Sequence, residues 1–60
     1  MSQDAEELVE GGIEFYKNYE KDKALAYFNK AIELDPNNAK AFGNRGRIYF
    51  EKNKFSIKHN

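Results

Sequence analysis

Few side chains of this 60-residue chain carry reactive groups. The sequence has one histidine, His59, two serines, Ser2 and Ser56, and no cysteine. It contains no glycine-rich phosphate loop and no cluster of metal-ligand residues. These residues do not supply a nucleophile together with a general base, so we expect no catalytic residue, no cofactor and no metal site.

Glutamates recur at four-residue spacing near the start of the chain. Glu6, Glu10 and Glu14 would lie one turn apart on a helix, as paired carboxylates do in some acid–base sites. On an amphipathic helix such residues usually form a solvated face. We therefore interpret them as surface residues.

Basic and aromatic residues are mixed in the last third of the chain. The cluster consists of Arg45, Arg47, Tyr49, Phe50, Lys52, Lys54 and Phe55. Cations that contact phosphates and rings that stack on bases are typical of proteins that bind single-stranded nucleic acid. Because the aromatic residues fall on the buried stripe of a predicted helix, nucleic-acid binding is the alternative and not the main prediction.

Charge is divided along the chain although the formal net charge is zero. Residues 1–20 contain six acids and one base, whereas residues 39–60 contain six bases and one acid. These charges either solvate helix faces or make two ends that attract each other in different copies.

Three helices are expected to position these groups. Asp4 is the predicted N-cap of the first, with Glu7 three residues later, and that helix runs to about residue 18. Gly11 and Gly12 lie inside it, and each lowers helix propensity by about 1 kcal/mol relative to alanine. They predict a bare face for close packing, or else a broken helix.

The central helix, from about residue 21 to residue 34, organises the chain. Ala24, Phe28 and Ala31 recur at helical spacing and predict a buried face on which Phe28 packs between two small residues. Asp35 and Pro36 end this helix because proline disfavours helical angles in the preceding residue.

A third helix is predicted from Ala39 to about residue 53. Asn38 is its expected N-cap. Residues 54–60 begin a short C-terminal partial helix in this interpretation.

The first and third predicted helices correspond at an offset of 34 residues. The matching pairs are Ala5/Ala39, Leu8/Phe42, Gly12/Gly46, Phe15/Tyr49 and Tyr16/Phe50. Helix pairs with this period are the spacing of tetratricopeptide repeats. The positions of that family's pattern fall on Leu8, Gly11, Gly12, Phe15, Ala24, Phe28, Ala31 and Pro36. The sequence therefore resembles a tetratricopeptide-repeat protein from residue 4 to about residue 55.

The resemblance implies an all-α fold of antiparallel helix-turn-helix repeats in a single domain, residues 1–60. One repeat covers residues 5–38 and an incomplete second repeat covers residues 39–60. Gly11 and Arg45 depart from the family pattern, which has leucine at both positions. Because about three repeats are normally needed for a stable stack, we expect a homo-oligomer or another protein partner.

The resemblance also implies a protein-interaction scaffold whose concave groove is lined by the first helix of each repeat. The predicted partner-binding residues are Val9, Ile13, Tyr16, Lys17, Asn44, Arg47 and Phe50. Other positions that match the groove are Glu6, Lys40, Gly43 and Glu51. Some family members hold a partner's C-terminal carboxylate with a lysine and an asparagine where this chain has Val9 and Ile13, so it does not resemble a carboxylate clamp.

An apolar strip of Val9, Ile13, Tyr16 and Phe50 is expected to bind a peptide or a second copy, or else to pack inside the three helices. The acidic start has no apolar run typical of a signal peptide, and no segment approaches the roughly 20 apolar residues of a membrane span. We expect a soluble, cytoplasmic protein.

Overall fold

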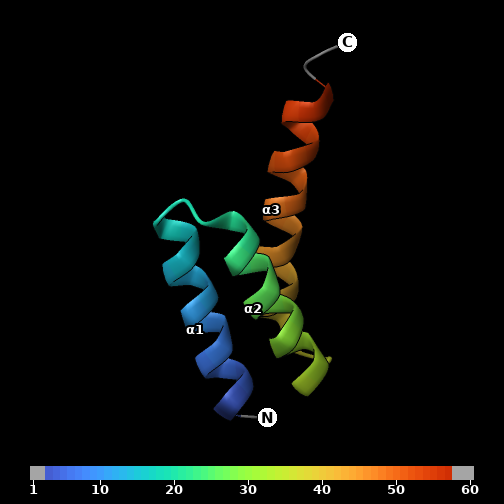
Figure 1. Cartoon of the computed structure of the whole chain (residues 1–60). Coiled ribbons are helices and arrows are strands. Elements are labelled where there is room, and N and C mark those ends of the chain that lie inside the picture. Colours follow the sequence, from blue (N-terminus) through green and yellow to red (C-terminus); the bar gives the residue numbers. More distant parts are fainter. Residues whose placement is uncertain (1–2, 58–60) are drawn as a thin grey trace.

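A computed structural model describes residues 3–57 as three α-helices, with side chains described as far as residue 53. The helices are α1 (Gln3–Lys17), α2 (Lys21–Leu34) and α3 (Ala39–Ile57) (Figure 1). Residues 3–57 contain no strand. The predicted all-α fold is confirmed, and the central helix has the predicted bounds.

α1 and α2 form an antiparallel hairpin joined by a tight turn. Tyr19 adopts a left-handed backbone conformation, with φ 65°, which is uncommon for a residue other than glycine. The N–H of Glu20 donates to the carbonyl of Phe15 at 2.9 Å, and the N–H of Tyr19 donates to the carbonyl of Tyr16 at 3.0 Å. This pair of bonds is a Schellman motif, so it ends α1 and sends the chain back along it.

α1 packs closely on α2 at Gly12. A Cβ atom built on Gly12 would lie 2.6 Å from Cε1 of Phe28, closer than real Cβ contacts. Phe28 itself is fully buried. The predicted close packing at Gly12 is therefore confirmed. Gly46 corresponds to Gly12 at the 34-residue offset, so the repeat predicts the same close packing there. That prediction is wrong, because a Cβ built on Gly46 would meet no atom within 4 Å beyond the nearby backbone of its own helix.

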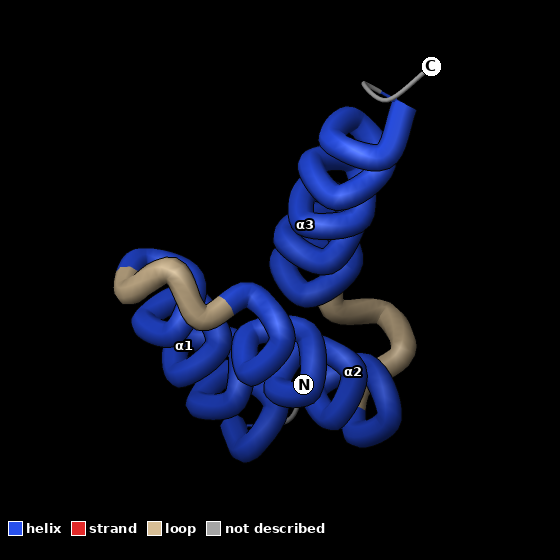
Figure 2. The backbone as a smooth tube through the Cα atoms, turned by 45° about the horizontal axis from the view of Figure 1, so that its top comes forward, coloured by secondary structure: helices blue, strands red, loops and turns tan. Residues whose placement is uncertain are grey.

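α3 lies antiparallel to α2 and parallel to α1. Its contacts with α1 join residues about one repeat apart, since Lys40 Nζ lies 4.0 Å from Glu6 Oε1 and Tyr16 contacts Glu51. The buried core that links the helices consists of Ala5, Val9, Ala24, Phe28, Ala31, Ala41 and Ile48. The C-terminal end of α3 projects beyond the other two helices (Figures 1 and 2), and the molecule measures 42 × 22 × 13 Å.

Asn38 caps α3 as predicted. Its Oδ1 accepts a hydrogen bond from the N–H of Ala41 at 3.0 Å, and its Nδ2 donates to Glu6 Oε2 at 3.2 Å. Asn38 is buried, so this side chain both starts α3 and fastens it to α1.

Two helix ends differ from the sequence prediction. α1 begins at Gln3, so Asp4 lies within the first turn instead of preceding the helix. α3 continues past Asn53 to Ile57, so the prediction of a separate C-terminal partial helix is wrong for residues 54–57. Residues 58–60 lie outside the described part. The helix continues because no described segment folds back on it, and each further residue can add an intrahelical hydrogen bond.

Candidate partner-binding surface

α1 and α3, the helices expected to line a groove, contact each other through Glu6 and Lys40 and through Tyr16 and Glu51. Val9 is only 1% exposed and belongs to the core, so it does not lie on an open surface. Ile13 is half-buried and packs against the same core. The predicted strip is therefore divided, with Val9 inside the fold, Ile13 and Tyr16 at its edge, and Phe50 outside.

A polar cluster of three residues joins all three helices. The hydroxyl of Tyr16 donates to Glu51 Oε2 at 2.7 Å, and Lys21 Nζ lies 3.1 Å from Glu51 Oε1. The hydrogen bond from Tyr16, followed by that from Lys21, lowers the pKa of Glu51. The same bond to Glu51 raises the pKa of Tyr16 above its ordinary value of 10.0. Tyr16 and Glu51 therefore hold the helices together.

Three other predicted partner-binding residues, Lys17, Asn44 and Arg47, do not belong to this cluster. Lys17 Nζ lies 4.0 Å from Glu14 Oε2 on its own helix. Asn44 Nδ2 donates to the carbonyl of Lys40 at 2.8 Å, so its amide is used within α3. Arg47 is exposed on α3, one turn before Phe50.

α3 presents an apolar surface to solvent, which we name the α3 face. It consists of Phe42, Gly43, Gly46, Tyr49 and Phe50. Phe42, Tyr49 and Phe50 are 44%, 45% and 66% exposed. The sequence prediction that these aromatic residues lie on a buried stripe is wrong, because α2 covers the opposite side of α3, where Ala41 and Ile48 are buried.

Arg45 shields part of the α3 face. Its guanidinium carbon lies 5.2 Å from the ring centre of Phe42 and 5.8 Å from that of Tyr49, distances typical of cation–π contacts. Its Nη1 also donates to Asn29 Oδ1 of α2 at 2.8 Å. These contacts, which sequence spacing did not indicate, leave Phe50 as the most exposed aromatic residue of the face.

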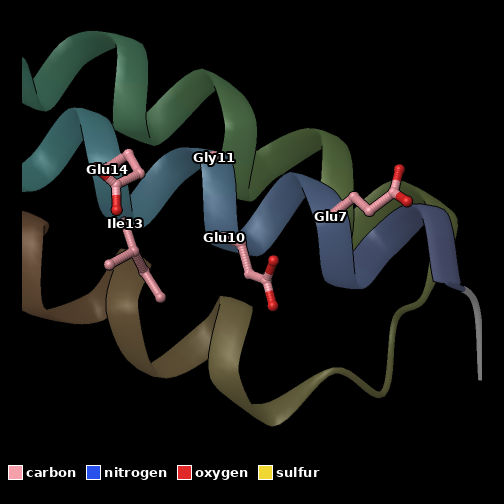
Figure 3. Close-up of a pocket in the computed structure, with 5 residues that line it drawn as sticks. All are labelled: Glu7, Glu10, Gly11, Ile13 and Glu14. Carbon is pink, nitrogen blue, oxygen red and sulfur yellow. The ribbon is translucent and has the colours of Figure 1, made fainter.

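The outer side of α1 carries a shallow depression, shown in Figure 3 and named here the α1 depression. Its lining residues are Glu7, Glu10, Gly11, Ile13 and Glu14. Ile13 supplies an apolar wall. Gly11 contributes backbone to the lining, since a Cβ built on it would point to α2 and meet Cε2 of Tyr27 at 2.9 Å. Glu7, Glu10 and Glu14 are exposed, which confirms the interpretation of Glu10 and Glu14 as surface residues. That interpretation is wrong for Glu6, which is half-buried and accepts a hydrogen bond from Asn38 Nδ2.

The described residues offer two exposed surfaces, the α3 face and the α1 depression. Among them no group of three or more histidine, cysteine, aspartate or glutamate residues is placed to hold a metal ion. No helix within residues 3–57 has the length and apolar character to cross a membrane. The surface offers an aromatic face with cations on one helix and a carboxylate-rimmed apolar depression on another.

Comparisons with known proteins agree with the internal repeat. The tetratricopeptide repeat matches twice, over residues 4–38 and over residues 27–59. The chain is 44% identical over 41 residues to "Stress-induced-phosphoprotein 1" of Caenorhabditis elegans, which covers 68% of this chain and 13% of that protein. It is 41% identical over 50 residues to "TPR repeat-containing protein MJ0798" of Methanocaldococcus jannaschii, and this aligned segment covers 83% of this chain and 15% of that protein.

No solved structure matches the chain. The matches to the two curated relatives span 13% and 15% of their lengths, so the likeness concerns the repeat and not those proteins as wholes. Each of the two family matches covers more than half of the chain, and the match over residues 4–38 spans about one repeat period. The chain therefore belongs to the tetratricopeptide-repeat family, whose repeats generally serve as non-catalytic protein-interaction scaffolds.

Proposed function

We propose that this chain is a protein-interaction module that associates with itself. It consists of one full repeat, residues 5–38, and the start of a second, within a single domain. The observation that carries the proposal is the exposed α3 face, because three aromatic side chains are solvent-exposed on one helix. Contiguous exposed apolar surface of this kind usually marks an interaction site.

Charge supports a second copy as the partner. The exposed acids Glu7, Glu10 and Glu14 lie on α1, and the exposed bases Lys40 and Arg47 lie on α3. A second copy brings the opposite charge to each of these helices. Complementary charge of this kind steers association and fixes orientation.

The same interaction function includes a second form, in which a peptide of another protein binds in a groove between α1 and α3. In that case the side of α1 and α3 that carries Ile13 and Phe50 stays open in solution and takes an apolar side chain of the partner. A chain that stays monomeric would favour this form.

Nucleic-acid binding remains the second candidate, and the exposure of Tyr49 and Phe50 beside Arg47 favours it. Against it, Arg45 already contacts Asn29, and Lys52 Nζ is paired with Asp22 Oδ1 at 2.7 Å. Retention on a single-stranded nucleic-acid column that decreases with salt would support this candidate.

Sedimentation equilibrium tests the proposal. We expect the apparent mass to rise from one chain to two over the micromolar range, at a salt concentration of about 0.1 M. A folded chain that keeps the mass of one copy up to millimolar concentration would contradict self-association, whereas the family's general role in protein binding would stand.

A further inference from the structure

We propose that the two copies meet at one specific contact, in which Phe50 of each copy lies in the α1 depression of the other. Arg47 of the first copy then faces Glu10 of the second. This inference rests on the self-association proposed above and names the surfaces that make it.

The donating surface is the part of the α3 face that nothing covers within the described chain. Phe50 is 66% exposed and is not among the aromatic rings that Arg45 contacts. Arg47 lies three residues earlier and therefore on a neighbouring position of the helix surface. The pair presents a large ring with a cation beside it.

The accepting surface has the matching shape and charge. Gly11 and Ile13 line an apolar hollow on α1, and carboxylates surround it. A ring that enters the hollow buries apolar surface against Ile13, while the neighbouring guanidinium meets a carboxylate. Buried aromatic anchors with complementary charges at the rim are the usual arrangement of specific interfaces.

The two surfaces can be used at the same time. Ile13 and Glu10 extend from α1 on the side where α3 lies in Figure 3, so this edge of the depression is turned toward the helix that carries Phe50. Two copies related by a two-fold axis would then make the Phe50 contact twice, as closed dimers do.

Direct pairing of the two α3 faces is less favourable. It would bring Arg47 and Lys40 of one copy close to the same residues of the other, and like charges in contact oppose association. The acidic surface of α1 relieves that repulsion instead of adding to it.

A charge-exchange experiment tests the contact on the full chain. We expect Arg47→Glu and Glu10→Arg each to weaken self-association about tenfold, because each places like charges at both contacts. An equimolar mixture of the two variants should restore the wild-type dissociation constant, because both contacts of the mixed dimer regain opposite charges. Phe50→Ala should weaken association at least about tenfold.

Matched controls separate folding from binding. Glu33→Arg changes an exposed acid on α2 and Leu34→Ala removes an exposed apolar side chain there, and neither should alter association. All variants should keep the helical circular dichroism of the wild type.

The outcomes distinguish this inference from the proposal beneath it. Dimers that form equally well with Arg47→Glu, Glu10→Arg or Phe50→Ala would overturn the contact and leave self-association in place. Single variants that dissociate but are not restored by mixing would also overturn it. A wild-type chain that never dimerises would overturn both.

Discussion

Gly12 and Gly46 occupy equivalent repeat positions but have opposite surroundings. A Cβ on Gly12 would meet Phe28 at 2.6 Å, whereas one on Gly46 would meet nothing within 4 Å. Gly12→Ala should therefore lower the free energy of unfolding, since overpacking by about 1–3 kcal/mol outweighs the gain in helix propensity. Gly46→Ala should raise it by about 1 kcal/mol.

Urea denaturation at a concentration where the chain is monomeric compares the two glycine variants. Each serves as the control for the other, because both make the same change within a helix. If both alanines stabilised the chain, the contact at Gly12 would not limit the packing of α1 on α2.

Phe28 is the largest fully buried side chain in the described part of the chain, and its ring lies against Gly12 of α1. Phe28→Ala should lower the free energy of unfolding by about 3–5 kcal/mol. That amount rivals the whole stability that a core of this size supplies, so the variant should lose its helical circular dichroism. Leu34→Ala, at an exposed site, should keep it. A Phe28→Ala variant with the wild-type melting temperature would contradict this packing.

Residue types alone predict the packing at Phe28 and Gly12, because both follow from helical spacing. They do not predict the exposure of Tyr49 and Phe50. An aromatic residue at a repeat position is buried only where another helix packs over it. The residue's own type and spacing do not reveal whether such a helix is present.

Asn38 connects two elements through one side chain, by capping α3 and by donating to Glu6 of α1. Asn38→Ala should lower the free energy of unfolding by about 1 kcal/mol through loss of the cap alone. The buried position adds to this loss, because the N–H of Ala41 would be left without a partner. Asn37→Ala, at an exposed neighbour, should change stability little, and equal melting temperatures for the two variants would contradict the role of the cap.

The cluster of Tyr16, Lys21 and Glu51 makes stability depend on pH. The pKa of Glu51 lies below its ordinary value of 4.5 in the folded chain, first because Tyr16 donates to it. Its stabilising effect is therefore present above pH 4.5 and is lost as pH falls through the lower folded pKa. Asp22, whose pKa is lowered by Lys52, acts in the same direction.

Glu51→Gln should destabilise the chain near neutral pH and make the loss of stability in acid shallower. Thermal melts between about pH 3 and pH 7 measure both effects. Glu33→Gln, at an exposed site on α2, is the control and should keep the wild-type profile. An unchanged profile for Glu51→Gln would show that the cluster does not link the helices energetically.

The ends of the elements are less predictable than their centres. Tyr19 takes the left-handed conformation that ends α1, although glycine or asparagine would adopt it more easily. Asn53, the equivalent residue one repeat later, lies inside α3 instead. α1 ends at Tyr19 because the chain turns back there to pack α2 against α1. Among the described residues no helix returns along α3, so α3 continues through Asn53.

The arrangement of the whole molecule follows from the repeat more than from any single residue. The offset between α1 and α3 predicts that the two helices run parallel, and the link from Tyr16 to Glu51 lies at that offset to within one residue. The α1 depression could not be predicted from the sequence, because it depends on the conformations that the glutamate side chains around Gly11 adopt in the folded chain. The relation between acidic and basic ends is visible in the sequence, but the faces that present these charges appear only in three dimensions.

Salt dependence separates the two forces that would join copies of this chain. Exposed ion pairs contribute about 0–1 kcal/mol each and are screened by salt, with a Debye length of about 10 Å at 0.1 M and 3 Å at 1 M. Apolar burial is not screened in this way. Raising salt from about 0.05 M to 0.5 M should therefore weaken association by no more than about tenfold, whereas Phe50→Asp should abolish it. Sedimentation equilibrium at both salt concentrations measures the difference. Complete dissociation at the higher salt would show that charge alone holds the copies together, and the aromatic face of α3 would then be left for a different protein.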